Sequence, residues 1–257
     1  MNTLRKKRRN GLTAYGLRIW ALLFAAMGMV GRGILQNRIL GVGMITDQEL
    51  FQVMEQNPNA MNIATAALLL QAVETCAVPI FSFLLAEGFQ RTSDRTKYIL
   101  RVCGVALLSE IPYDLAMSGK LLNFSRQNPA MALVLSMVML LFFVRYEEKG
   151  WKNTLIKLAV TVAACLWTVM LKVEFGFCIV LIVCVLWIFR ENTMYRGFIA
   201  AGAAMVCTLI SPLFITAPMG VLTIHFYNGQ KGYGNRTVNY LAYPVMLLLV
   251  GVAGMFF

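Results

Sequence analysis

The sequence predicts an all-α fold: a polytopic transmembrane helical bundle of eight to nine membrane helices, with residues 1–257 forming one integral-membrane domain. Three observations support this fold class. The chain is 59% apolar and only 14% charged, whereas about a quarter of the residues in a typical soluble domain are charged. Apolar segments near the length of a membrane-crossing helix, about 20 residues, recur along the chain. Most basic residues stand at the ends of these segments, where membrane proteins concentrate them.

Apolar length and helix-breaking residues define the spans in order. The second span is long for a perpendicular crossing, and Pro79 predicts a kink within it. Residues 212–227, which contain Pro218 and Gly220, form either a re-entrant half-helix or a ninth short span. The side of the membrane that holds the C-terminus therefore stays open. The eight spans are residues 17–40, 60–88, 98–115, 129–144, 155–171, 175–189, 197–214 and 241–257.

The distribution of charge orients the bundle. With the N-terminus inside, 16 of the 23 basic residues fall at cytoplasmic positions, in agreement with the positive-inside rule. Residues 1–16 then form a basic cytoplasmic N-terminus. Residues 41–59 form an external loop without a basic residue. Within this loop Thr46 and Glu49 have the spacing of a capping box, which predicts a short interfacial helix on the outer leaflet.

Composition excludes several other classes of function. The formal net charge is +11, but no compact basic domain is left beyond the span ends, so we expect no nucleic-acid partner. All six cysteines lie in apolar segments, where they behave as small hydrophobes rather than as a disulfide framework. Cys178 and Cys184 have no nearby histidine or CxxC partner, so we expect no metal site. Membrane lipid is the expected environment.

Charged side chains inside the spans are candidates for a functional site, because burying a charge in hydrocarbon is costly. Arg32 lies in the first span, Glu74 near the middle of the second and Glu110 deep in the third. We expect Arg32 to pair with Glu74 or Glu110. Such a pair either fixes the helix register or lines a substrate cavity. In a catalytic cavity Arg32 would stabilise developing negative charge, and a carboxylate would act as a base.

The loop after the second span is basic. Glu87, Arg91 and Arg95 follow at four-residue intervals and would share a helix face if the second span continued to Arg95. The cluster is either a solvated helix end or a cradle for the phosphate groups of a cytosolic coenzyme. The basic residues of this cluster are Arg91, Arg95, Lys97 and Arg101.

The third span contains a proline among polar residues. Pro112 removes a helical hydrogen bond and frees a carbonyl near Glu110. Tyr113 and Asp114 follow directly, and together with Glu87 they are candidate substrate-binding residues.

Four further polar residues stand near the ends of later spans. His225 is the only histidine, and it is either an interfacial side chain or a general base. Asn228 lies in a polar, glycine-containing turn and is a candidate substrate-binding residue. Lys172 and Glu174 bracket a short turn, and we expect them only to end the helices on either side.

Several sequence blocks resemble the TraX family of bacterial membrane proteins. They are PIFSFLLAEGF at 79–89, LSEIPY at 108–113, FYNG at 226–229 and YLAYP at 240–244. The resemblance implies a multi-pass protein of the bacterial inner membrane. The named member of the family acts in conjugal transfer: it acetylates the N-terminus of the pilin subunit, with acetyl-CoA as the presumed donor.

The resemblance implies transfer of an acetyl or other acyl group from a cytosolic acyl-CoA to a membrane-embedded or exported peptide or glycan. The basic cluster would hold the coenzyme phosphates, and Glu110 and His225 would be candidate bases. The histidines typical of the first and last spans are absent here, where residues 29–33 read MVGRG and residues 243–246 read YPVM. Two alternatives stay open: a non-catalytic accessory protein of a secretion or conjugation apparatus, and a small-molecule transporter.

Overall fold

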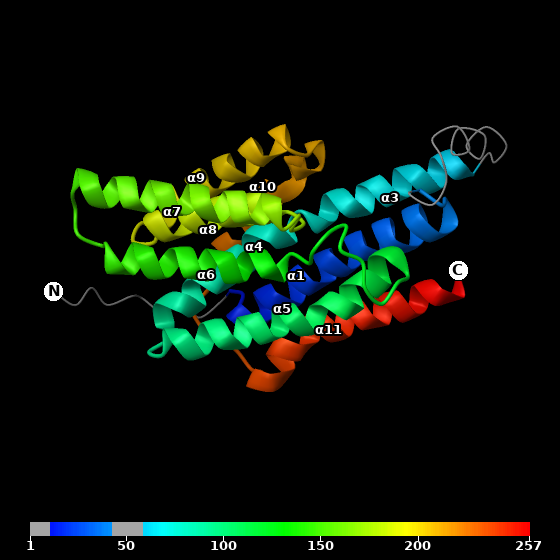
Figure 1. The fold of residues 1–257 in the computed structure, drawn as a ribbon, viewed down its shortest axis with the longest axis horizontal. Coiled ribbons are helices and arrows are strands. Elements are labelled where there is room, and N and C mark those ends of the chain that lie inside the picture. Colours follow the sequence, from blue (N-terminus) through cyan, green and yellow to red (C-terminus); the bar gives the residue numbers. More distant parts are fainter. Residues whose placement is uncertain (1–10, 43–58) are drawn as a thin grey trace.

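A computed structural model describes residues 11–42 and 59–257, and the regular structure throughout these residues is helical (Figure 1). The predicted all-α class is therefore confirmed. The expected cytoplasmic residues 1–10 and the predicted interfacial helix in 41–59 lie largely outside the described residues. We call the end of the bundle where α1 begins the N-terminal end, and the end where α5 and α11 terminate the far end.

The first helical segment has two parts. Helix α1 (Ala14–Met29) begins at Thr13, whose side chain accepts a hydrogen bond from the Gly16 backbone N–H. It continues as a π-helical segment, η1 (Val30–Ile39). Wider helical turns of this kind are rare and are frequently found at functional sites. Glycines let neighbouring helices approach closely: a Cβ at Gly31 would lie 2.8 Å from the Ala67 carbonyl oxygen of α3.

The predicted second span consists of two helices, α3 (Ala60–Glu74) and α4 (Ala77–Arg91). The chain breaks at Thr75 and Cys76. A proline disrupts a helix about one turn before its own position, so the break agrees with the predicted kink from Pro79. Pro79 lies in the first turn of α4, where the missing N–H costs little. The break is also stabilised by polar contacts, because the Thr75 hydroxyl lies 2.8 Å from the Thr216 hydroxyl.

The middle of the chain forms four antiparallel helices. Helix α5 (Arg95–Ser118) reaches the far end, and α6 (Ala130–Arg145), α7 (Trp151–Met170) and α8 (Gly176–Ile188) pack beside one another. Helix α5 contains Pro112 without interruption and ends at Gly119, which adopts a left-handed conformation with φ of 69°. These bounds agree with the third to sixth predicted spans within a few residues.

The last part of the chain contains three helical segments, where the eight predicted spans placed two. Helix α9 (Thr193–Val206) is followed by 3₁₀ turns η2 (Cys207–Leu209) and η3 (Pro212–Thr216), and then α10 (Ala217–His225). Residues 212–214 therefore belong to the following segment, and not to the predicted span 197–214. Helix α11 (Arg236–Ala253) and η4 (Gly254–Phe256) carry the C-terminus to the far end (Figure 1).

Not every helix has the dimensions of a membrane span. Four helical segments of the described chain are long and apolar enough to cross a bilayer: Ala14–Ile39, Ala60–Arg91, Trp151–Met170 and Thr237–Phe256. Four further apolar helices are shorter: Ala130–Arg145, Gly176–Ile188, Thr193–Leu209 and Pro212–His225. The composition and helical architecture are those of a membrane protein.

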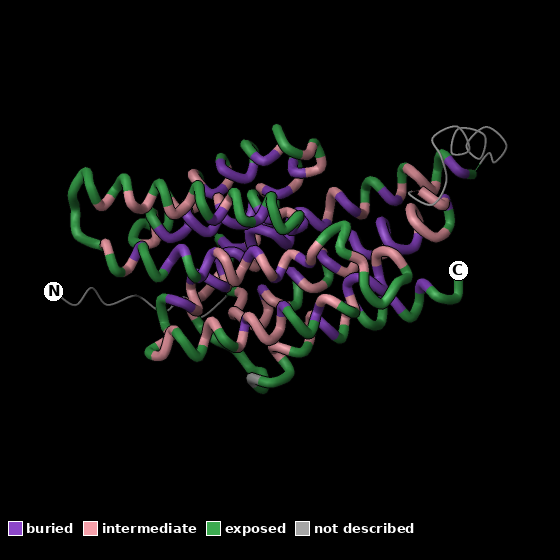
Figure 2. Tube along the Cα trace, viewed as in Figure 1, coloured by how far each residue is buried: buried purple, intermediate pink, exposed green. Residues whose placement is uncertain are grey.

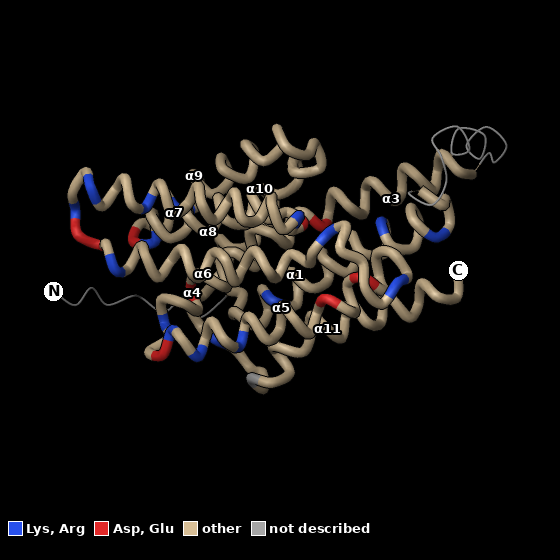
Figure 3. Tube along the Cα trace, in the orientation of Figure 1, with Lys and Arg blue, Asp and Glu red and all other residues tan. Residues whose placement is uncertain are grey.

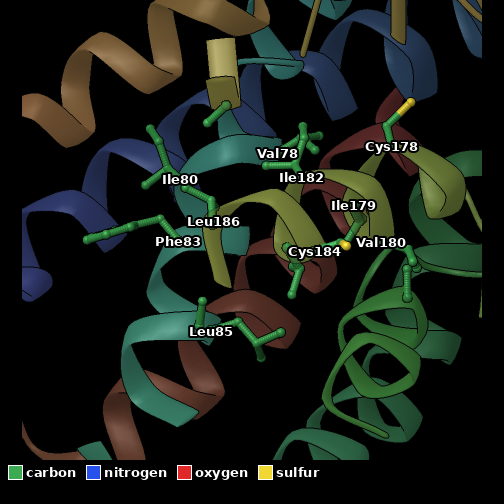
Figure 4. Close-up of a cluster of buried hydrophobic side chains, with 14 of the residues drawn as sticks. Val78, Ile80, Phe83, Leu85, Cys178, Ile179, Val180, Ile182, Cys184 and Leu186 are labelled. Carbon is green, nitrogen blue, oxygen red and sulfur yellow. The ribbon is translucent and has the colours of Figure 1, made fainter. Parts of the chain in front are cut away.

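Helices α4 and α8 form the centre of the apolar core. Phe83 and Ile182 are buried, from α4 and α8 respectively, and belong to one cluster (Figure 4). Burial is concentrated along these central helices, whereas the outer faces of α7 and α11 are exposed (Figure 2). Those faces carry large apolar side chains such as Leu166 and Leu249, as is expected of surfaces in contact with lipid.

Charged residues collect at the two ends of the bundle and at one place inside it (Figure 3). Many of the described basic residues lie at the N-terminal end, in the α4–α5, α6–α7 and α8–α9 connections and the helix ends beside them: Arg91, Arg95, Lys97, Arg145, Lys149, Lys152, Arg190 and Arg196. The charges inside the bundle belong to the site described next.

Candidate functional site

A buried cluster of ionised side chains lies where η1, α3 and the α7–α8 turn meet. The Arg32 guanidinium forms an ion pair with Glu74, with Nη2 3.2 Å from Oε2, and a second ion pair with Glu174. Its Nε donates to the Gln71 amide oxygen at 3.3 Å, and its guanidinium carbon lies 5.5 Å from the centre of the Phe175 ring. The side chains of the ion pairs are at most 10% exposed.

Two further residues connect this cluster to α5 and to the far end. The Tyr113 hydroxyl donates to Glu174 Oε2 at 2.5 Å. The Arg126 guanidinium lies 3.8 Å from Glu174 Oε1, and its side chain is 66% exposed. Arg32 and Arg126 thus balance the charges of Glu74 and Glu174. A buried charge that kept no partner would be strongly unfavourable.

The predicted pairing of Arg32 with Glu74 is confirmed, whereas Glu110 is not its partner. The interpretation of Glu174 as a residue that only ends a helix is wrong. Glu174 is buried because residues 172–175 form a tight turn in which Lys172 and Phe175 have positive φ. Two backbone hydrogen bonds with Gln127 hold this turn against the α5–α6 connection. Sequence spacing does not reveal such a long-range contact.

Glu110 belongs to a separate polar contact beside the cluster. Its Oε2 accepts hydrogen bonds from the Asn128 side-chain amide and, at 3.4 Å, from the Asn128 backbone N–H. Asn128 is fully buried and also donates to the Ala106 carbonyl at 2.9 Å. Asp114 similarly accepts from the Asn123 backbone N–H at 2.7 Å. These contacts fix the α5–α6 connection, whereas the buried Glu110 Oε1 has no hydrogen-bond partner among the described residues.

An apolar cavity of about 150 Å³ extends from the cluster toward the N-terminal end. One wall is a face of α1, where Arg18, Leu22, Ala25 and Met29 recur every three to four residues. Glu74 is its only acidic lining residue, and Arg18 is its only basic one. The Tyr243 side chain of α11 also lines the cavity, and its buried hydroxyl has no hydrogen-bond partner among the described residues. The other polar residues that line it are Tyr98, Asn239 and Tyr240.

A second cavity, of about 370 Å³, lies on the opposite side of the cluster and is polar. Arg32 and Tyr113 line this cavity, whereas Glu74 and Phe175, which both contact Arg32, line the apolar one. The ion pair between Arg32 and Glu74 therefore separates the two cavities. The remaining lining residues of the polar cavity are Gln36, Asn37, Val42, Asp114, Met117, Ser118, Lys120, Asn123, Ser125 and Arg126.

The second span does not continue to Arg95, so Arg91 and Arg95 do not share the helix face that such a continuation would give. Helix α4 ends at Arg91, and Thr92 is extended, so Arg95 begins a different helix. Arg91 forms an ion pair with Glu87 at 2.5 Å and donates to the Gly229 carbonyl at 3.0 Å. Arg95 lies over the Phe89 ring, with 5.3 Å between the guanidinium carbon and the ring centre.

Asp94 caps the start of α5 within this loop. Its carboxylate accepts a hydrogen bond from the Lys97 backbone N–H at 2.9 Å and forms an ion pair with the Lys97 ammonium at 2.9 Å. The backbone hydrogen bond, followed by the contact with the Lys97 side chain, lowers the pKa of Asp94 below its ordinary value. Arg101 lies further along α5 and is half-buried.

His225 and Asn228 are not part of the buried cluster. His225 is exposed at the end of α10, beside the Phe226 ring at the N-terminal end. Asn228 joins the loop after α10 to the start of the chain: its backbone N–H donates to the Leu12 carbonyl, and its side chain donates to the Gly11 carbonyl at 3.0 Å. The structure therefore does not bring His225 together with Glu110, Glu74 or Arg32.

The fold and the site define a helical protein of the membrane type, with a buried ion-pair cluster between an apolar and a polar cavity. The profile of the family described as TraX protein matches residues 42–253, and the chain belongs to this family. The resemblance drawn from the sequence blocks is thus confirmed. No curated protein and no solved structure matches the chain.

Sequence reasoning missed Glu174 of the buried cluster, and Arg18 and Tyr243 of the apolar cavity. Glu174 was interpreted only as a helix-ending residue because it lies in a turn. Arg18 was one of the 16 basic residues used to orient the bundle and was not considered as part of a site. Tyr243 lies in the YLAYP block, which was a signal for this position, although it did not reveal a buried hydroxyl.

Proposed function

We propose that this protein is a multi-pass membrane acyltransferase that moves an acetyl or other short acyl group from a cytosolic acyl-CoA to a membrane-embedded or exported acceptor. The observation that carries the proposal is the placement of Glu74 and Arg32. They are in contact, yet Glu74 lines an apolar cavity and Arg32 lines a polar one. A donor and a hydrophilic acceptor can thus approach one ionised centre from opposite sides.

The proposed topology places the N-terminal end in the cytoplasm of a bacterium and the bundle in its inner membrane. The α3–α4 pair counts as one crossing, as do η3 and α10, so the chain crosses nine times and ends outside. The concentration of basic residues at the N-terminal end supports this orientation. Helices such as α8, with 13 residues, would require a locally thinned bilayer.

The coenzyme would bind at the N-terminal end. The four basic residues after α4 are retained there as candidates for its phosphate groups, because guanidinium and ammonium groups favour phosphate. Arg91 contributes less freely than the others, since Glu87 and the Gly229 carbonyl already contact it. Arg18, at the same end of the apolar cavity, is a further cation beside the donor's path. These residues are Arg18, Arg91, Arg95, Lys97 and Arg101.

The size of the apolar cavity favours a short acyl group. A cavity of about 150 Å³ is sufficient for a molecule the size of benzene, and thus for an acyl chain of a few carbons. The buried Tyr243 hydroxyl, which has no partner among the described residues, would donate to the thioester carbonyl. An unpaired buried hydroxyl is costly, so a ligand that satisfies it is favoured.

The chemistry assigns one role to each charged residue. An acceptor hydroxyl or amine attacks the thioester carbonyl, the carbon–sulfur bond breaks and the coenzyme leaves as a thiol. Glu74 takes up the acceptor's proton and then gives it to the departing sulfur, while the Arg32 guanidinium stabilises the negative charge that develops on the carbonyl oxygen. Glu174 and Tyr113 hold Arg32 in position. We assign the base to Glu74 because Glu110 is engaged by Asn128 and His225 is remote.

Binding of acetyl-CoA by the purified protein tests the proposal. Tyr243→Phe removes only the hydroxyl and is expected to weaken binding of acetyl-CoA while binding of free CoA is unchanged. The double variant Arg91→Ala/Arg95→Ala is expected to weaken both. Lys149→Ala, a basic residue of the α6–α7 connection, is the control. Absence of acetyl-CoA binding to the parent protein would contradict the proposal.

A transporter is the second candidate, and the same cluster supports it. Two cavities that meet at an ion pair could be exposed alternately to the two sides of the membrane. In proteoliposomes a transporter gives substrate flux without acyl transfer, whereas the acyltransferase consumes acetyl-CoA. The third interpretation, an accessory protein of a conjugation apparatus, predicts neither activity.

A further inference from the structure

The polar cavity at the far end has the dimensions and lining of a ligand site. Its volume of about 370 Å³ is within the range of small-molecule pockets, about 300–1,000 Å³. Four kinds of polar group surround it: guanidinium and ammonium groups, one carboxylate, side-chain amides and hydroxyls. Such a surface binds a ligand through many hydrogen bonds.

The charges that face this cavity favour an anion. Arg126 and Lys120 line it and are exposed, and the contact of Arg126 with Glu174 is long, at 3.8 Å. Arg32 forms the floor but is already paired with Glu74 and Glu174. Among the described residues Asp114 is the only acid in the lining, and its carboxylate accepts a hydrogen bond from the Asn123 N–H.

One more basic residue lies near the cavity, but the protein backbone already engages it. Arg38 also lies at the far end, but its guanidinium donates to the Gly254 carbonyl at 3.2 Å and to the Leu115 carbonyl at 3.3 Å. It therefore ties η1 to α5 and to the end of the chain. Arg126 and Lys120 are the cations of the cavity that remain directed to a ligand.

The amides and hydroxyls of the lining favour a ligand with several hydroxyl groups. Gln36 and Asn123 provide side-chain amides, and Ser118, Ser125 and Tyr113 provide hydroxyls. Side chains of these types both donate and accept hydrogen bonds, as a hydroxyl ligand does. Several of them already have one protein partner, such as Gln36 with Gln71 and Ser118 with the Asp114 carbonyl, and keep further donors or acceptors for a ligand.

We propose that the far-end cavity binds a small polyhydroxy carboxylate, with Arg126 and Lys120 contacting the carboxylate and the amides and hydroxyls contacting the hydroxyl groups. The proposal deepens the proposed function, since a hydroxyl held beside Arg32 and Glu74 would be the acyl acceptor. A positively charged amine is disfavoured by the same two cations. The identification as acceptor rests on the proposed function, whereas the binding itself does not.

Three linear polyols of similar size test the proposal: gluconate, sorbitol and glucamine, which carry a negative, a neutral and a positive end. Binding to the purified protein is measured by calorimetry without any acyl donor. Gluconate is expected to bind at least about tenfold more tightly than sorbitol, because a charge-assisted hydrogen bond exceeds a neutral one by roughly that factor. Glucamine is expected to bind most weakly.

Two variants locate the site. Arg126→Gln and Lys120→Gln should each reduce gluconate affinity about tenfold and leave sorbitol affinity unchanged. Lys149→Gln, at the other end of the bundle, is the matched control and should have no effect. Equal affinities for gluconate and sorbitol, no binding of any of the three, or unchanged gluconate affinity in Arg126→Gln would overturn the proposal. Acetyl-CoA binding is measured separately, so failure here is distinguishable from failure of the proposed function.

Discussion

Replacing Arg32 by methionine tests how much the buried cluster contributes to stability. Methionine retains much of the side-chain volume but removes the charge that faces Glu74 and Glu174, which are at most 5% exposed at the side chain. Removing one partner of a buried ion pair costs about 3–5 kcal/mol. An independent estimate agrees. A buried carboxylate that has lost its partner can become neutral by binding a proton, and protonating a carboxylate of ordinary pKa near 4.3 at pH 7 costs about 3.7 kcal/mol.

The assay is thermal unfolding of the purified protein in one detergent at pH 7. At about 2–4 °C per kcal/mol for a chain of this size, Arg32→Met should lower the midpoint by about 6–20 °C. The variant Arg32→Met/Glu74→Gln/Glu174→Gln removes all three charges and should recover most of that loss, since no charge is left unpaired. An Arg32→Met midpoint within about 2 °C of the parent would refute this reasoning.

Three other substitutions test particular contacts by the same assay. Gly33→Ala should destabilise the protein by about 1–3 kcal/mol because its methyl group would overlap the α5 backbone. Gly104→Ala, with open space around it, should instead stabilise the protein by about 0.5–1 kcal/mol. A Gly104→Ala variant less stable than Gly33→Ala would contradict the packing. Asp94→Asn should be less stable than the parent at neutral pH, and the difference should vanish as pH falls through the lowered pKa of Asp94; a difference independent of pH would exclude the charge as its cause. Asn128→Leu should cost about 1–3 kcal/mol by removing the side-chain hydrogen bond to the Glu110 carboxyl, and an unchanged midpoint would show that this contact contributes nothing.

The sequence was sufficient to predict most helices because apolar length and breaker residues are local signals. It also predicted that Arg32 pairs with Glu74 or Glu110, since isolated charges at similar depth have few alternatives, and the structure shows Glu74 as the partner. Pro79 predicted the break in the second span, but not its contact with Thr216, a residue far along the chain. The spacing of Arg91 and Arg95 allowed a continuous helix that the structure does not contain.

It was harder to predict which residues form the site than which kinds of contact they make. Buried acids were correctly expected to need partners, but Glu110 finds Asn128 rather than Arg32. Glu174 enters the cluster because a tight turn and the Gln127 backbone hold it there. Such contacts depend on the packing of several helices, which no local pattern encodes.

The central claim is that Glu74, at the junction of the two cavities, is the base for acyl transfer. Inner-membrane vesicles that contain the protein are supplied with labelled acetyl-CoA, and the label that enters lipid, protein and soluble acceptors is measured. We predict that Glu74→Gln lowers the transfer rate at least about 100-fold, while Glu110→Gln changes it only a few-fold, with both variants folded by thermal unfolding. Transfer by Glu74→Gln at the parent rate would contradict the claim.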